Sequence, residues 1–279
     1  FLTILGEELV AFRDGSGRVG VLHAHCVHRG ASLEYGLIQE RGIKCCYHGM
    51  VFDVDGTCLN APFPKGEEAE AKKYACSIQQ GAYKAFERNG LVFAYMGPPD
   101  KEPPFPEWES DFTVAPGDEL VPYSNFQHCN WLQVQDNAAD NFHTAELHAA
   151  KNVVGGHFQG TTFDEVGSPT MEVHPDMQFV PIHGGRGLAC SGARRVNNDK
   201  LFIRVQHQVL PNLSLHAYTS EDGSNKKLFS RFHIIRWTVP VDDFNSKMIG
   251  WRVMGPGIDT RGIGQKELVG YESIDFLDG

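Results

Sequence analysis

Cysteine and histidine occur together in two short pairs near the start of the chain. Cys26 and His28 form a C-x-H pair, and Cys45 and His48 form a C-x-x-H pair sixteen residues further on. Each pair offers one thiolate and one imidazole, which suits a [2Fe–2S] cluster whose two irons are held by two cysteines and by two histidines. Exchanging thiolates for neutral imidazoles removes negative charge from one iron and raises its reduction potential. The pattern therefore predicts an electron-carrying cluster, to which each loop delivers one ligand for each iron.

The same four residues are also compatible with structural zinc, or with a chance set of buried cysteines and solvated histidines. Zinc patterns commonly pair Cys with Cys and His with His, whereas both pairs here are mixed. Glycine also follows both loops, as Gly30 and Gly49. Cys46 adjoins Cys45, and the C-x-x-H spacing selects Cys45 as the ligand.

A second pattern, D-x-x-H-x-x-x-x-H, is formed by Asp140, His143 and His148. Good helix formers predict a helix over residues 130–142, on which Asp140 and His143 share a face. His143 and His148 would lie roughly 140° apart on an ideal helix, so both bind one metal only if the helix kinks, bulges or ends between them. Two histidines and a carboxylate make the facial triad of non-heme Fe(II) oxygenases, although single histidines more often satisfy buried polar contacts.

Longer stretches around both patterns resemble one family. C-V-H-R-G-A-S-L and C-C-Y-H-G-M-V-F-D look like the two cluster loops of Rieske iron–sulfur proteins, most of all those of the ring-hydroxylating oxygenases. Asp140, His143 and His148 match the mononuclear-iron motif of the Rieske oxygenases position by position. The chain is thus similar to the catalytic α subunit of an α-only, phthalate-, vanillate- or carbazole-type enzyme. Met50 departs from the family's usual Trp, which we interpret as a change in packing.

The resemblance implies roles for the residues of the second pattern. His143 and His148 would hold an iron that binds O₂ beside the substrate. Asp140 would not bind the iron but would accept hydrogen bonds, so that electrons pass from His48 of one chain through Asp140 to His143 of the next. Because each cluster then serves a neighbour, a head-to-tail ring follows, and the family's form of it is a homotrimer or stacked trimers.

The third iron ligand is expected to be an Asp or Glu from a late segment of the chain. The candidates present are Glu267, Glu272, Asp275 and Asp278, and none stands in a distinctive pattern. We choose Asp275 among them and expect the true ligand to lie beyond Gly279, because the chain is shorter than typical family members. The chain also opens without Met, as if inside a strand, so truncation at both ends is expected.

The expected fold class is α+β. Residues 1–97 form an all-β Rieske [2Fe–2S] domain, and residues 98–109 a linker stiffened by five prolines. Residues 110–279 form a catalytic domain in which helices cover an antiparallel sheet around the mononuclear iron. The period-2 and turn patterns predict the following strands: 2–12, 19–25, 51–54, 57–59, 77–83, 90–96, 201–209, 213–218, 229–239 and 248–254. Residues 60–75 are expected to be a solvated loop, and turns are expected at 14–17, 55–56, 221–224 and 242–245.

Polar residues on the later strands have two readings. Arginines at 204, 231, 236 and 252 either pair with a carboxylate-bearing substrate or form an outward charged face, which is the more common case for each alone. Asn212, Ser214 and His216 face either a pocket or solvent, because alternation does not say which side is inward.

Composition excludes several classes of protein. The chain has 279 residues, of which 41% are hydrophobic and 22% charged, as in globular proteins. A net charge of −10 argues against nucleic acid as a partner. No apolar run approaches the roughly 18 residues of a membrane span, and no signal peptide is recognisable. Of the seven cysteines, the five outside the two Cys/His pairs are scattered, which fits free thiols in the cytoplasm.

The implied reaction takes electrons from NAD(P)H through a separate reductase or ferredoxin, since the chain has no flavin or nucleotide signature. The chain would then use O₂ to hydroxylate, or oxidatively O-dealkylate, an aromatic or other apolar ring substrate. Whether one or both oxygen atoms are inserted, and into which substrate, stays open. The alternatives are a zinc-stabilised binding module and a Rieske-type electron-transfer protein. Electron carriers of the respiratory type have an extra cysteine in each loop, where this chain has Ala31 and Tyr47.

Overall fold

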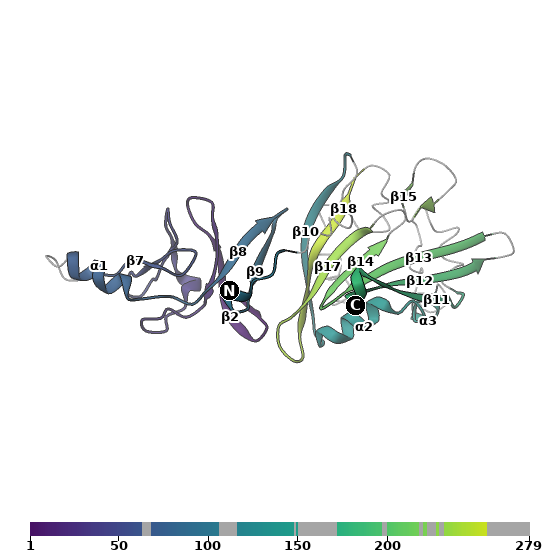
Figure 1. Cartoon of the computed structure of the whole chain (residues 1–279), viewed down its shortest axis with the longest axis horizontal. Coiled ribbons are helices and arrows are strands. Elements are labelled where there is room, and N and C mark those ends of the chain that lie inside the picture. The colour runs from purple at the N-terminus through teal and green to yellow at the C-terminus, as the bar shows by residue number, and fades with distance from the viewer. Residues whose placement is uncertain are drawn as a thin grey trace. The chain divides into compact units, whose positions relative to one another are not determined.

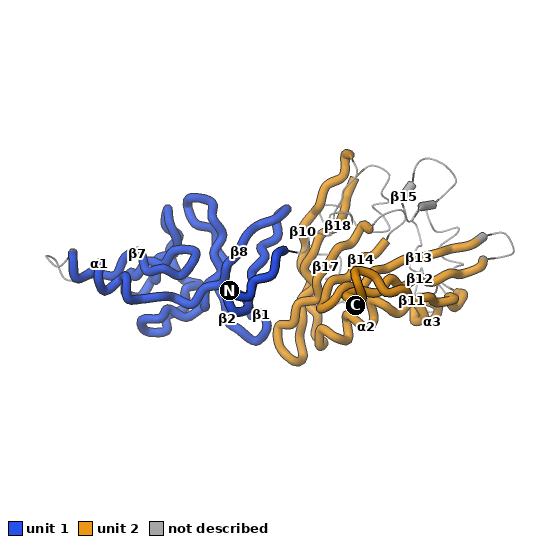
Figure 2. Tube along the Cα trace, in the orientation of Figure 1, with its two compact units in different colours: residues 1–106 blue, residues 107–279 orange. Residues whose placement is uncertain are grey.

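Antiparallel strands dominate both halves of the chain, and only a few short helices accompany them (Figure 1). The structure is a computed structural model. It describes residues 1–62, 68–105, 116–147, 149, 172–196, 200–217, 220–221, 227–228 and 232–255. The chain divides into two units, Phe1–Pro106 and Glu107–Gly279, drawn in blue and orange in Figure 2. The expected α+β class is confirmed.

A five-stranded antiparallel sheet forms the base of the first unit, in the order β1-β2-β3-β8-β9. Its strands are β1 (Leu2–Ile4), β2 (Glu7–Arg13), β3 (Val19–His23), β8 (Ala82–Arg88) and β9 (Leu91–Tyr95). The single strand predicted over 2–12 is therefore wrong, because Leu5 and Gly6 adopt positive φ of 53° and 77° and reverse the chain between β1 and β2.

A smaller four-stranded sheet carries the second Cys/His loop. It consists of β4 (Leu37–Ile38), β5 (Ile43–Lys44), β6 (Val51–Phe52) and β7 (Cys58–Asn60), and it follows the short 3₁₀-helix η1 (Leu33–Tyr35). The hairpin predicted around Asp55-Gly56 is confirmed by the pairing of β6 with β7. Cys26, Cys45 and Met50 are buried together in one apolar cluster with Leu22 and Phe52.

Residues Glu68–Cys76 form helix α1, so the loop predicted over 60–75 is wrong for this part. The segment E-A-E-A-K-K-Y-A-C consists largely of strong helix formers, and its charges, which led to the loop prediction, are compatible with a solvated helix face. The strand predicted over 77–83 begins later, at Ala82, because the chain between α1 and β8 carries turns and the inward-pointing Gln80. A 3₁₀-helix, η2 (Pro99–Lys101), follows β9.

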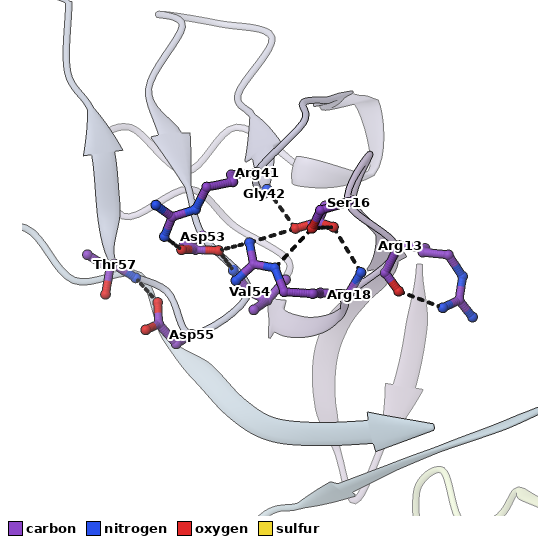
Figure 3. A network of polar contacts seen from close by, with 11 residues as sticks. Arg13, Ser16, Arg18, Arg41, Gly42, Asp53, Val54, Asp55 and Thr57 are labelled. Atoms are coloured by element: carbon purple, nitrogen blue, oxygen red, sulfur yellow. Dashed lines mark hydrogen bonds and ion pairs between the residues drawn. The ribbon is translucent and has the colours of Figure 1, made fainter. Parts of the chain in front are cut away.

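Two buried carboxylates join the base sheet to the smaller sheet (Figure 3). Arg18 donates hydrogen bonds to both Asp14 and Asp53, at 2.7 and 2.6 Å, and Arg41 also pairs with Asp53. The backbone N–H of Gly42 donates to Asp14 at 3.2 Å. This network fixes the segments that flank the second Cys/His loop.

The second unit is built on a seven-stranded antiparallel sheet, in the order β10-β18-β17-β14-β13-β12-β11. Its strands are β10 (Glu119–Gln127), β11 (Asp176–Ile182), β12 (Gly187–Val196), β13 (Lys200–Val209), β14 (Leu213–Ala217), β17 (Phe232–Pro240) and β18 (Ser246–Met254). A 3₁₀-helix, η3 (His183–Gly185), and a two-stranded ribbon of β15 (Ser220–Glu221) and β16 (Lys227–Leu228) complete it. The strands predicted after residue 200 are confirmed as one sheet, and β10 to β12 were not predicted.

Turn predictions in this unit had different outcomes. The turn at 242–245 is confirmed, because the Asp242 carboxylate accepts hydrogen bonds from the backbone N–H groups of Phe244 and Asn245. Most of the turn predicted at 221–224 lies outside the described residues.

The two faces of this sheet differ in polarity. Helix α2 (Trp131–Ala139) lies on one face, where its Gln135 side chain contacts Gln208 and Ser214. On the other face, Leu215, Ile235 and Trp251 are fully buried. Among the described helices, none is long and apolar enough to cross a membrane.

Candidate functional site

The two Cys/His loops have the same backbone turn although their spacings differ. The carbonyl of Cys26 accepts from the N–H of Gly30 at 2.8 Å, and that of Cys45 accepts from Gly49 at 3.1 Å. Both glycines have positive φ, 70° and 74°, which glycine adopts without steric cost. Each cysteine N–H also donates to the residue after its glycine, Ala31 or Met50. The loops are thus closed by the same two hydrogen bonds.

The four side chains gather as a pair of thiols and a pair of imidazoles. Cys26 and Cys45 are buried in the same apolar cluster, and the rings of His28 and His48 lie 4.7 Å apart between centroids. Both histidines are exposed. Burial raises the pKa of the Cys26 thiol; the backbone N–H of His28 opposes this rise and the Cys45 thiol adds to it. This donor set, two sulfurs inside and two nitrogens outside, fits a [2Fe–2S] group with unlike irons.

The first loop is held from behind by a residue that no sequence pattern marked. The Gln80 side chain, 1% exposed, accepts from the N–H of Val27 and donates to the carbonyls of His23 and His25. The His25 ring also hydrogen-bonds Glu8 and the Gly30 carbonyl, and these two contacts raise the pKa of His25. His25 is therefore a hydrogen-bonding histidine that supports the first loop.

The second pattern lies where two helices meet. Helix α2 begins at the N-cap Asn130, whose side chain accepts from Leu132, and it ends at Ala139 with Asp140 as its C-cap. The short helix α3 (Thr144–Leu147) begins directly after His143. The helix predicted over 130–142 is therefore too long, because it ends at Ala139 and the chain is interrupted before His143. Asn141, which is buried, and the capping Asp140 break the helix at this point. The break predicted between His143 and His148 cannot be followed to its end, because His148 lies outside the described residues.

Asp140 and His143 contact each other across this turn. His143 Nδ1 and Asp140 Oδ2 are 3.1 Å apart. Partial burial acts to raise the pKa of Asp140, but hydrogen bonds from the Phe142 N–H and from His143 lower it below its usual range. The Asp140 side chain is 45% exposed, so part of its carboxylate stays open to solvent in a single chain. Its exposed side can accept a further donor.

A buried arginine fixes the same turn from the sheet. Arg194 on β12, 1% exposed, donates to the carbonyls of Asn141 and Val173 and pairs with the hydroxyl of Thr144. Burial, followed by the charge of Arg204, lowers the pKa of Arg194 to about 10. No sequence pattern marked Arg194, because its partners lie far along the chain and two of the three are backbone carbonyls, 21 and 53 residues away.

The remaining predicted iron ligands fall outside the part of the chain that the structure describes. These are His148, Asp275 and the other late acidic candidates. Among the described residues, no three His, Cys, Asp or Glu side chains converge on a single ion position.

Comparison with known proteins adds to this geometry. The family model of the Rieske [2Fe-2S] domain matches residues 1–80. The chain is 44% identical over 281 residues to the tert-butanol monooxygenase / tert-amyl alcohol desaturase oxygenase subunit of Aquincola tertiaricarbonis, covering 100% of this chain and 57% of the relative. It is 38% identical over 251 residues to the phthalate 4,5-dioxygenase oxygenase subunit of Pseudomonas putida, covering 85% and 54% respectively. The chain thus spans little more than half the length of these relatives.

The crystal structure of dicamba monooxygenase bound to dicamba has the same fold. It superposes with a TM-score of 0.65 at 20% identity, covering 96% of this chain and 74% of the other. The match to the cluster domain covers most of the first unit, and the similarity to oxygenase subunits continues through the second. From its Rieske [2Fe–2S] domain onward, therefore, this chain belongs to the family of Rieske oxygenase α subunits.

Proposed function

We propose that this chain is the terminal oxygenase component of a multicomponent system. It would receive electrons that originate from NAD(P)H and use O₂ to hydroxylate, or oxidatively O-dealkylate, an aromatic or other apolar ring substrate. The observation that carries this proposal is the 3.1 Å contact of Asp140 with His143, in a chain that also pairs its cluster thiols and imidazoles. An electron carrier alone has no use for such an acid–histidine pair.

In the first unit, Cys26 and Cys45 would hold the inner iron, and His28 and His48 the outer one. The bound cluster supplies one electron at a time. The chain's contribution is to keep the thiolates in the apolar cluster and to present the two imidazoles at the surface. Electrons would then leave through His28 or His48.

In the second unit, His143 and His148 would hold a mononuclear iron, with Asp275 or a later carboxylate as the third ligand. Bound iron supplies the activation of O₂. Asp140 accepts a hydrogen bond from His143 Nδ1–H, which fixes the tautomer of the ring and would leave Nε2 as the nitrogen available to a metal. The domains proposed from the sequence are retained: the cluster domain at 1–97, the linker at 98–109 and the catalytic domain at 110–279.

The partners and the assembly follow from the exposed positions of the two redox groups. The open side of Asp140 would receive His48 of a neighbouring subunit, which gives a head-to-tail ring. The family's form of this ring is a homotrimer or stacked trimers, and we propose the same assembly for this chain. A separate reductase or ferredoxin would deliver electrons to the cluster. All seven cysteines are free thiols, which fits our proposal of a cytoplasmic location. The relatives' names point to an alcohol in one case and to phthalate in the other.

Metal analysis and one substitution test the function in the full-length protein. Iron in two kinds of site together with acid-labile sulfide is expected; a carrier would lack the mononuclear iron, and a zinc-stabilised module would contain zinc only. His143→Ala should leave the visible spectrum of the cluster intact and abolish substrate-dependent use of NADH in a screen of aromatic acids and ethers. His128→Ala, at a histidine of the same unit outside both patterns, should change neither. Full activity of His143→Ala would overturn the proposal.

A further inference from the structure

The helix-bearing face of the large sheet is buried yet polar, which is unusual for a sheet face that lies inside a unit. Register pairs place Gln206 opposite His216, and Ser214 opposite Arg236. Side chains two residues apart on a strand, and those directly paired across strands, point to the same side. The face covered by α2 therefore carries polar side chains along β13, β14 and β17. Such a surface inside a protein needs partners for its polar groups.

His216 and Gln206 lack such partners within the described part of the chain. His216 is 5% exposed and Gln206 is 4% exposed. Neither His216 Nε2 nor Gln206 Oε1 makes a hydrogen bond to a described residue. Leaving a buried polar atom unsatisfied costs about 1–3 kcal/mol. A ligand that reached these two atoms would supply the missing hydrogen bonds.

Positive charge surrounds this pair. Burial, and then the charges of Arg236, Arg204 and Arg252, hold the pKa of His216 well below its usual range, so the imidazole is neutral. The three arginines are half-buried and lie on the helix-bearing face. They do not form the outward charged face that is the more common case for a single arginine. Arg236 makes no ion pair with any described carboxylate, and its buried Nε has no acceptor among the described residues. We call Arg204, Gln206, His216, Arg236 and Arg252 the polar patch.

Apolar side chains lie beside the polar patch. Ile234, the register partner of both His216 and Arg252, is 4% exposed, and the ring of Tyr123 lies 5.4 Å from the Arg252 guanidinium. A ligand at this place would meet an anion-binding end and an apolar wall together. Inorganic phosphate would use only the first of these, whereas an aromatic carboxylate would use both.

The polar patch also lies beside the proposed iron site. Gly192 on β12 is the register partner of Arg204, and a Cβ at Gly192 would stand 3.2 Å from the Asn141 side chain, between Asp140 and His143 in sequence. His216 lies on the second strand from β12, which corresponds to about 10 Å at the usual spacing of strands. A ring bound over β13 could therefore reach both the Asp140–His143 turn and the polar patch.

We propose that the polar patch binds the carboxylate of an aromatic acid substrate, with Arg236 and the Nε2–H of His216 as donors. The inference rests on the proposed function, because it names the substrate class of that same site. Arg236 is a specificity-determining residue here, and it supplies a charged two-donor fork that suits a carboxylate. The Gln206 amide can turn either its oxygen or its nitrogen toward the ligand.

Equilibrium binding tests the proposal without turnover. Benzoate and its neutral counterpart benzamide are titrated calorimetrically into the full-length holoprotein, kept oxidised and without a reductase. Benzoate should bind about ten- to a hundredfold more tightly, the range expected for charge-assisted hydrogen bonds. Arg236→Gln should abolish this difference, and Arg236→Lys should restore part of it. Arg195→Gln, an exposed arginine on the opposite face of β12, should keep it.

Each outcome decides one question. Equal binding of benzoate and benzamide, or an undiminished preference in a folded Arg236→Gln protein, overturns the polar patch as a carboxylate site. If inorganic phosphate bound as tightly as benzoate, the polar patch would be a general anion site, and this result would also overturn the proposal. A protein that prefers benzoate but lacks mononuclear iron would refute the oxygenase function alone. A protein that oxidises only neutral rings would keep that function and refute this inference.

Discussion

The cluster loops and the Asp140–His143 turn are two ways of presenting ligands. The four cluster ligands lie within 23 residues, between Cys26 and His48, and each loop is closed by hydrogen bonds within itself. The turn between α2 and α3 is instead held by Arg194, from a strand more than fifty residues away. A site built from neighbouring residues can therefore be predicted almost completely from its sequence motif, whereas a site held together by distant segments cannot.

The two places also differ in how they treat charge. The cluster thiols lie in an apolar cluster, where thiolates are costly unless a metal neutralises them. The Asp140 carboxylate keeps nearly half of its surface exposed and has an imidazole partner in the chain. We therefore expect the folding of the cluster loops to depend strongly on bound metal. The function of Asp140 should instead depend on which group binds to its exposed side.

The largest effect is expected from the choice between two adjacent cysteines. Cys45→Ser should eliminate the visible absorbance of the cluster and all NADH-dependent activity, because Cys45 is buried beside Cys26. Cys46→Ser should leave the absorbance unchanged, since Cys46 is exposed. Iron and sulfide content per chain measures both. If Cys46→Ser lost the cluster and Cys45→Ser kept it, the shared-turn geometry would be the wrong guide to the ligands.

The open side of Asp140 gives the next effect. Asp140→Asn should retain both metals but slow reoxidation of the reduced cluster by O₂ and substrate about a hundredfold, because outer partners of metal-bound histidines contribute factors of this order. Stopped-flow absorbance of the cluster follows the reaction. Asp136→Asn, an exposed acid one helical turn earlier, should react at the normal rate. Normal reoxidation in Asp140→Asn would exclude the acid as a bridge between subunits.

The cluster loops could be predicted from the sequence more completely than the Asp140–His143 turn, for physical reasons. The loops, the α+β class and the later strands were predictable, because they depend on spacing, period-2 alternation and turn residues. Helix α1 was missed because a charged composition is common to loops and solvated helices. Gln80 and Arg194 were missed because their partners are backbone atoms, which leave no mark on sequence. The polar patch was ambiguous, since alternation identifies two faces of a strand but not which one a helix will cover.

Removing the support of the α2–α3 turn should destabilise the second unit strongly. Arg194→Met keeps the volume but removes three charge-assisted hydrogen bonds, to the carbonyls of Asn141 and Val173 and to the hydroxyl of Thr144. The free energy of unfolding should therefore fall by about 3–5 kcal/mol. Arg195→Met, at the neighbouring exposed arginine, should change it by less than about 0.5 kcal/mol. Urea denaturation followed by tryptophan fluorescence measures both. Equal losses would mean that the turn does not depend on Arg194.

The corresponding support of a cluster loop should matter less, because that loop is closed by its own hydrogen bonds. Gln80→Leu should lower the free energy of unfolding by about 2 kcal/mol, because it removes three hydrogen bonds of a buried side chain, to the Val27 N–H and to the carbonyls of His23 and His25. Gln79→Leu, whose partner is the exposed Asp55 carbonyl, should cost less than about 1 kcal/mol. The urea midpoint of cluster absorbance reports the difference. A larger loss for Gln80→Leu than for Arg194→Met would reverse the comparison between local and distant support.

The smallest expected effect is a loss of stability of the first unit at acid pH. Burial acts to raise the pKa values of Asp14 and Asp53, but hydrogen bonds from Ser16, Val54 and the arginines outweigh it and hold both below their usual range. Groups with a depressed pKa in the folded state stabilise it above their unfolded value of about 3.9, and this stabilisation is lost as the pH falls below that value. The urea midpoint of cluster absorbance should therefore decline as the pH falls from about 5 toward about 3.

A matched pair of substitutions assigns this decline. Asp53→Asn should lower the free energy of unfolding at neutral pH by about 1 kcal/mol, since Arg18 and Arg41 are largely exposed, and it should flatten the decline. Asp55→Asn, at an exposed acid two residues away, should leave the profile unchanged. Because Asp53 joins the two sheets and binds no metal, a decline of normal steepness in Asp53→Asn would assign the acid sensitivity to the cluster ligands themselves.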